Sequence, residues 1–141
     1  MNKQHAWHSL VAAAATLSLS VAIAQVAPDE PQRLEFNGIS VVNSGPDLDE
    51  VEKVKRMAKT YPLRIEFSGK GGDFYVADRL SLKQRGQVLA DVPGAGPWVL
   101  MGVPNGTYEL EASFGAQTLR RAVTVGRGGT TVHWVLPASI E

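Results

Sequence analysis

The chain has 141 residues, with 14 basic residues, 14 acidic residues and no cysteine. This length favours a single domain, and the balanced charge lacks the basic surplus with which proteins bind nucleic acid or anionic lipid. Without cysteine the chain cannot form a disulfide, a thiolate nucleophile, a lipid-modified thiol or a cysteine-ligated zinc site.

Residues 1–24 have the pattern of a secretory signal peptide. A short start with one charged residue, Lys3, leads into the apolar run LVAAAATLSLSVAIA, which ends in Ala22-Ile23-Ala24. The run is shorter than the roughly 20 apolar residues that span a bilayer, so we expect cleavage after Ala24 and no stable membrane anchor afterwards. A cysteine-free exported domain of this size is typical of the bacterial periplasm or of a bacterial secreted protein.

Residues 25–46 are predicted to form a linker and an N-terminal extension. The first part, QVAPDEPQ, is polar and contains proline, which favours an irregular segment. Residues 33–42 alternate loosely between apolar and polar, and they form either a short edge strand or a segment lying over the core.

Residues 47–60 are predicted to form the one helix of the mature chain. Leu48, Val51 and Val54 recur at helical spacing, acidic residues gather at the start and basic residues at the end. Asp47, with Glu50 three residues later, has the pattern of a capping box at the helix N-terminus, and Ser44 with Asp47 has the same pattern one turn earlier.

From residue 61 to residue 138 the apolar period changes to two. In LRIEFS, Leu63, Ile65 and Phe67 share one face, and turns rich in glycine and proline recur further along the chain. This pattern predicts an all-β fold, an antiparallel β-sandwich of about seven strands preceded by one short helix.

The stretch Trp98–Phe114 is predicted to form a hairpin. Four residues would build its turn: Pro104, Asn105, Gly106 and Tyr108. The proline sets φ, the asparagine and glycine tolerate positive φ, and the tyrosine restarts the inward face with its hydroxyl near the edge. The pair Gly115-Ala116 predicts a second, two-residue turn, which places Glu111 opposite Arg120.

The stretch GPWVLMGVPNGTYELEASFGAQTLRRAVTV, residues 96–125, resembles the G-P-x-L-x-x-x-L-P-x-G-x-Y-x-V-x-A hairpin of carboxypeptidase regulatory-like domains. These are transthyretin-like, or prealbumin-like, sandwiches, and small exported proteobacterial proteins combine one of them with a signal peptide and a short helix. The resemblance covers residues 61–137. It implies a transthyretin-like fold and an accessory role, with sugar binding open because related folds belong to carbohydrate-binding-like superfamilies.

The sequence assigns no catalytic, metal-binding or cofactor-binding residue, and we expect no cofactor and no enzymatic activity. His133 is the one histidine after the signal peptide; it is out of phase with Val132 and Trp134, and the sequence gives it no visible partner. Two enzyme classes built on related sandwiches, hydroxyisourate hydrolases and intradiol dioxygenases, use several histidines, so neither activity is supported.

Three aromatic residues are candidates for ligand binding: Trp98, Trp134 and Tyr75. Exposed together on one face they would form a stacking platform for a sugar, whereas buried they would be core residues. We expect a non-enzymatic interaction or accessory protein whose partner is an unknown envelope protein or a glycan, with binding at an exposed strand edge ranked first. A carbohydrate-binding module is the alternative, and a hydrolase is third.

Overall fold

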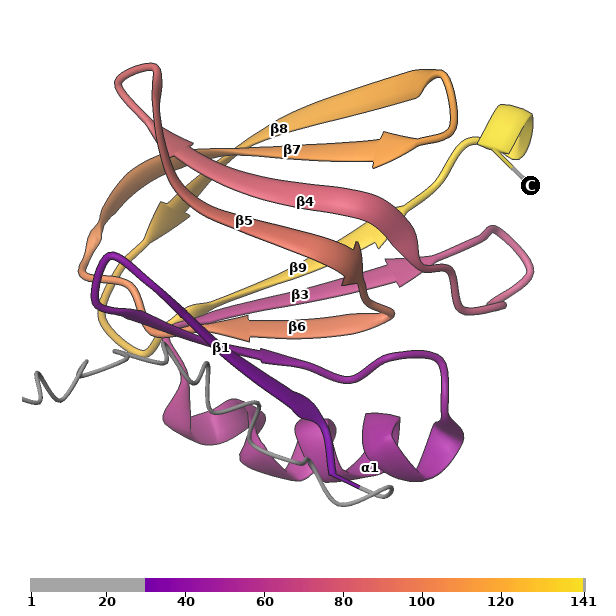
Figure 1. Ribbon diagram of the computed structural model, residues 1–141, viewed down its shortest axis with the longest axis horizontal. Coiled ribbons are helices and arrows are strands. Elements are labelled where there is room, and N and C mark those ends of the chain that lie inside the picture. Colours follow the sequence, from indigo (N-terminus) through magenta and orange to yellow (C-terminus); the bar gives the residue numbers. More distant parts are fainter. Residues whose placement is uncertain (1–29, 141) are drawn as a thin grey trace, which may run out of the picture.

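The computed structural model describes residues 30–140, which form two β-sheets packed face to face, with a helix on the outside (Figure 1). Sheet A has the strand order β1-β2-β6-β3-β9 and sheet B the order β5-β4-β7-β8. The strands of sheet A are β1 Gln32–Phe36, β2 Ile39–Asn43, β6 Trp98–Met101, β3 Leu63–Ser68 and β9 Thr130–Val135. The strands of sheet B are β5 Gln87–Ala95, β4 Ala77–Gln84, β7 Gly106–Phe114 and β8 Gln117–Val125. The all-β sandwich predicted from the sequence is confirmed.

The strand count and one pairing differ from the prediction. The described residues contain nine strands where about seven were expected, and β9 lies parallel to β3, with Leu63 opposite Thr130. All other neighbouring strands are antiparallel. An alternating pattern identifies a strand but not the direction of its neighbour, so the parallel pair could not be read from the sequence.

The hairpin of β1 and β2 corrects the prediction that the sandwich begins at residue 61. The two strands pair antiparallel around a turn at Asn37 and Gly38, whose φ angles are 50° and 81°. Positive φ at both central positions is the geometry of a tight two-residue hairpin. The loosely alternating segment is therefore an edge strand followed by an interior strand of sheet A, with β2 beside β6.

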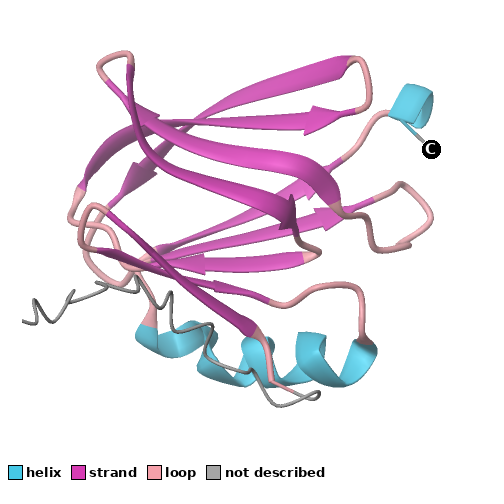
Figure 2. Cartoon of the chain, in the orientation of Figure 1, coloured by secondary structure: helices cyan, strands magenta, loops and turns pink. Residues whose placement is uncertain are grey.

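The predicted helix at residues 47–60 is confirmed. It consists of α1, Leu48–Met57, followed by a 3-10 turn, Ala58–Thr60, and it lies on the outer side of sheet A (Figure 2). Asp47 is the N-cap, and its side chain accepts a 2.8 Å hydrogen bond from the amide of Asp49. The buried side of the helix packs on apolar residues of β2 and β6, in a cluster of Val42, Val51, Val54, Ala58, Trp98 and Leu100.

The main core lies between the two sheets and comes from alternate residues of each strand. In β3, Leu63, Ile65 and Phe67 are fully buried, as the two-residue period predicts. Leu80 and Leu110 face them from sheet B. Each strand therefore has one face in the core, and the outer face of sheet B carries mostly polar residues, with Val88 and Ala122 exposed among them.

The predicted signal peptide, residues 1–24, and the first part of the predicted linker lie outside the described residues. Within residues 30–140, no helix is long and apolar enough to cross a membrane.

Candidate functional site

The three candidate aromatic residues do not share an exposed face. Trp98 is 8% exposed and lies under α1 on the outer face of sheet A, whereas Trp134 is 6% exposed and lies in the main core, 5.6 Å from the ring of Phe67. Both tryptophans are therefore buried, and they form no exposed platform for stacking. Tyr75 is half-buried and packs against the edge of the main core.

Tyr75 lines a shallow cleft of about 340 Å³ at one end of the sandwich, together with Phe114 and Ile140. The polar groups around this cleft bond to one another. Asp78 accepts a 2.6 Å bond from the amide of Gly115. Gln117 exchanges two bonds with Ser139. These contacts close the end of the sandwich by tying the C-terminal 3-10 turn, Ala138–Ile140, to the start of β8.

The predicted turn residues lie in a crossing between the two sheets, which corrects the hairpin prediction. β6 belongs to sheet A and β7 to sheet B, and neither Asn105 nor Gly106 has positive φ. A Cβ on Gly106 would lie 3.2 Å from Nε2 of Gln84, the far end of a flexible side chain, so neither φ nor packing requires glycine at this position. Tyr108 is buried, and its hydroxyl donates a 2.7 Å bond to the carbonyl of Pro104. Burial raises the pKa of Tyr108, so the hydroxyl remains a donor that fixes the crossing against β7.

His133 is exposed between buried Val132 and Trp134, and it has a partner that the sequence did not reveal. Its Nδ1 lies 2.8 Å from Oε1 of Glu66 on the neighbouring strand, and its ring stands edge-on to Trp98 at 6.5 Å. The three residues form one row across β6, β3 and β9. The sequence carried no signal for this pair because the two residues are 67 positions apart.

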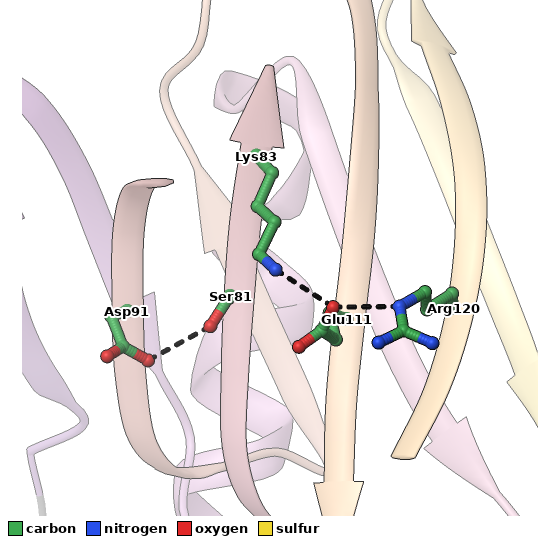
Figure 3. A network of polar contacts seen from close by, with 5 residues as sticks. All are labelled: Ser81, Lys83, Asp91, Glu111 and Arg120. Carbon is green, nitrogen blue, oxygen red and sulfur yellow. Dashed lines mark hydrogen bonds and ion pairs between the residues drawn. The ribbon is translucent and has the colours of Figure 1, made fainter. Parts of the chain in front are cut away.

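The outer face of sheet B carries a ladder of polar contacts (Figure 3). On β5 and β4, Asp91 accepts a 3.1 Å bond from Ser81 and pairs with Arg79. On the other half of the sheet, Glu111 lies between Lys83 and Arg120, 2.9 Å from each, and the predicted pairing of Glu111 with Arg120 is confirmed.

The bond from Lys83, then that from Arg120, together with their charges, lowers the pKa of Glu111 in spite of partial burial. Asp91 and Glu111 therefore each have a cationic partner on an adjacent strand. These groups hold the strands of sheet B together, and Lys83 also lines a shallow cleft of about 340 Å³ with Glu109 and Ala122.

β8 is an edge strand of nine residues that contains neither proline nor glycine. Its hairpin with β7 closes at Phe114 and Gln117 around a two-residue turn. The closing pair of such a hairpin exchanges hydrogen bonds, and the bonded pairs then alternate along the strands. The backbone groups of Thr118, Arg120, Ala122 and Thr124 therefore point away from β7, toward the open edge.

Most of the outward backbone groups of β8 have no hydrogen-bond partner among the described residues. In the part of the chain that the structure describes, one of them takes a bond from another residue: the carbonyl of Thr124 accepts 2.7 Å from the hydroxyl of Thr130. This bond lies at the end of β8 that is followed by the turn into β9. The strands β8 and β9 separate from there toward the other end of the molecule (Figure 1). Thr118, Arg120 and Ala122 are all exposed.

We call the segment Thr118–Ala122 the open β8 edge. An open edge with free amides and carbonyls can take up an extended chain as an additional strand. The sequence predicted the strand but gave no sign that it is an edge, because edge position depends on which strands pair, not on the residues of the strand itself.

No protein-family model matches this chain, and no curated protein matches its sequence. The resemblance to carboxypeptidase regulatory-like domains therefore rests on the quoted residues alone.

Proposed function

We propose that this chain is an exported, non-enzymatic binding module that takes up an extended segment of a partner protein along the open β8 edge. The observation that carries the proposal is the row of outward backbone groups at Thr118, Arg120 and Ala122, none of which has a partner within residues 30–140. Strand addition supplies such groups with main-chain hydrogen bonds, and the side chains of the edge strand then select the partner.

The geometry of the other polar groups agrees with a binding role. Glu111, Asp91 and Glu66 each contact a side chain on a neighbouring strand, in positions that stabilise the sheets. The transthyretin-like resemblance adds the expectation of an accessory module, which is a role that needs a partner protein.

Export is the second part of the proposal, and it rests on the pattern of residues 1–24. We expect a periplasmic or secreted bacterial protein that begins at Gln25. Mass spectrometry of the protein purified from the cell envelope tests this expectation directly. An intact Met1 in the envelope protein contradicts it.

Site-specific photocrosslinking in living cells tests the binding edge. A photoreactive residue at Thr118 should crosslink to a partner protein, whereas the same residue at Glu52, on the exposed side of α1, should not. The substitution Ala122→Pro removes an outward amide while leaving the bonds to β7 in place, so it should abolish crosslinking from position 118. Equal crosslinking from both positions, or crosslinking that persists with Ala122→Pro, rejects the β8 edge as the binding site.

A further inference from the structure

We infer that the segment bound at the open β8 edge is acidic, with two consecutive carboxylate side chains that face Arg120 and Arg121; this inference rests on the proposed strand addition. The strand β8 and the turn after it, through residue 129, contain three arginines and no acidic residue. Opposite charges on directly facing residues of neighbouring strands stabilise their pairing.

Arg120 lies on the outer face of sheet B with its side chain 62% exposed. Its Nε donates to Glu111, but that carboxylate also accepts from Lys83. Two cations therefore share one carboxylate, so Glu111 does not fully neutralise Arg120, the cation on the edge strand itself; Glu109 on the same face stands opposite Lys83 on the interior strand β4. A carboxylate on an added strand, on the same face, would neutralise Arg120.

Arg121 alternates to the other side of β8, where Leu119 and Val123 turn toward the core. It is exposed, and its guanidinium reaches the carbonyl of His133 on β9 at 3.4 Å. An added strand would thus meet an apolar, a positive and an apolar residue in turn on this side. A complementary strand places apolar residues opposite Leu119 and Val123 and an acidic residue opposite Arg121. The neighbouring residue of that strand faces Arg120 on the outer face of sheet B, and it is acidic as well.

A second copy of this chain is a poorer occupant for the same edge. Antiparallel pairing of two β8 strands centred on Arg120 would place this arginine directly opposite its own copy. Like charges in facing positions destabilise strand pairing, and charged residues on an edge are a common protection against self-association. The acidic residue nearest to the edge other than Glu111 is Glu109, which stands opposite Ala122 on β7. Glu109 is exposed, and no ion pair joins it to either arginine.

Four short peptides test the inference on the purified protein. The acidic probe is Val-Thr-Glu-Glu-Val-Thr, and its neutral and basic counterparts carry two glutamines or two lysines in place of the glutamates. The fourth probe replaces both threonines of the acidic peptide with proline, which removes the amides needed for a ladder while keeping the charge. The readout is amide chemical shift and hydrogen exchange at Thr118, Arg120 and Ala122 by NMR at millimolar peptide concentration.

We expect the acidic peptide to slow exchange at these three amides and to bind about tenfold more tightly than the glutamine peptide at low salt. The advantage should shrink as salt is raised, because exposed charges are screened. If the glutamine peptide binds equally well, the acidic preference is wrong while strand addition stands. If the proline peptide binds as well as the acidic one, or if no peptide affects β8, strand addition itself is wrong. Protection that grows with protein concentration in the absence of peptide means that a second copy is the occupant, and it overturns the inference.

Charge reversal gives the matched control. Arg121→Glu leaves one positive and one negative side chain at the edge, so it should abolish the preference for the acidic peptide over the lysine peptide, and Arg121 has no ion pair in the described residues whose loss would disturb the fold. Arg56→Glu makes the same change in net charge on α1, on the opposite side of the sandwich, and should leave the preference unchanged. An equal effect of both variants would reveal attraction by overall charge and would overturn the inference.

Discussion

The two outer strands of sheet B, β5 and β8, have the same length of nine residues, but the fold treats them differently. On β5, Asn37 donates to the carbonyl of Leu89 at 3.1 Å and Asn43 to the carbonyl of Gly94 at 2.8 Å, while Pro93 has no amide to offer. On β8 the outward groups remain open through Ala122. Side-chain amides of Asn37 and Asn43 therefore cover backbone carbonyls of β5, whereas the open β8 edge has arginine side chains but no such cover.

The closure of β5 comes from the β1–β2 hairpin, which precedes the helix in the chain. Asn37 is in its turn and Asn43 is its last residue. The hairpin therefore does more than extend sheet A: it supplies the donors that cover the neighbouring edge of sheet B. An edge strand therefore stays available for strand addition where no other part of the fold covers its outward backbone groups. The following substitutions alter either the covered β5 edge or the open β8 edge.

The largest expected effect is that of Asn43→Ala on the closed side. Asn43 is 3% exposed; its Oδ1 accepts from the buried amide of Gly96 at 2.8 Å, and its Nδ2 donates to Gln32 as well as to Gly94. The substitution leaves that amide without a partner, and we expect a loss of about 2–4 kcal/mol in the free energy of unfolding. Urea denaturation measures it. Gln32→Ala removes only one partner of Asn43 and should cost about 0.5 kcal/mol, so equal losses would contradict this account.

A pair of proline substitutions on β8 tests its hydrogen-bond pattern. The amide of Arg121 points toward β7, where its partner is Leu110, and the amide of Ala122 points outward. Arg121→Pro should therefore destabilise the protein by about 2–3 kcal/mol more than Ala122→Pro, because only the former breaks a ladder bond. Thermal unfolding of both variants decides the matter. The reverse order would mean that the open edge has been assigned to the wrong residues.

The turn of the β1–β2 hairpin offers a smaller perturbation of the closed edge. Asn37 has φ 50° and bonds to Leu89, so Asn37→Ala should cost about 1–2 kcal/mol through backbone strain and the lost bond. Asn37→Gly tolerates the same φ and loses only the bond, so its cost should be about half as large. Chemical denaturation of the two variants separates the two contributions. If both variants retain the stability of the parent, Asn37 does not hold the hairpin against β5.

The smallest expected effect concerns the pH dependence of the β7–β8 pairing. Since Lys83 and Arg120 lower the pKa of Glu111 below 4.5, its charged form stabilises the folded state. This contribution is present above about pH 4.5 and is lost as the pH falls further through the lowered pKa. Because the site is partly exposed, we expect less than about 1 kcal/mol. Unfolding free energies of the parent and of Glu111→Gln, measured from pH 7 to pH 3, should converge at low pH; a constant difference would contradict the assignment.

The sequence predicted the parts of this fold that depend on local pattern. The buried faces of β3 and β9, the capped helix and the turn at Gly115 follow from the spacing of apolar and turn residues over a few positions. The crossing at Pro104 could not be predicted in this way, because Pro-Asn-Gly favours a change of chain direction without specifying which sheet the next strand joins. The pair of Glu66 and His133 and the open β8 edge likewise depend on contacts between distant segments.

The parallel pairing of β3 and β9 has a consequence for how the chain reaches this structure. The two strands lie side by side although paired residues are 67 positions apart, and β9 is the last strand of the sandwich. Contacts between such distant segments slow folding, because a long loop must close before they form. Phe67 and Trp134 meet only when β9 docks. While the chain emerges from its N-terminus, sheet A therefore stays incomplete until residues 130–135 are available, which favours a late, cooperative folding step.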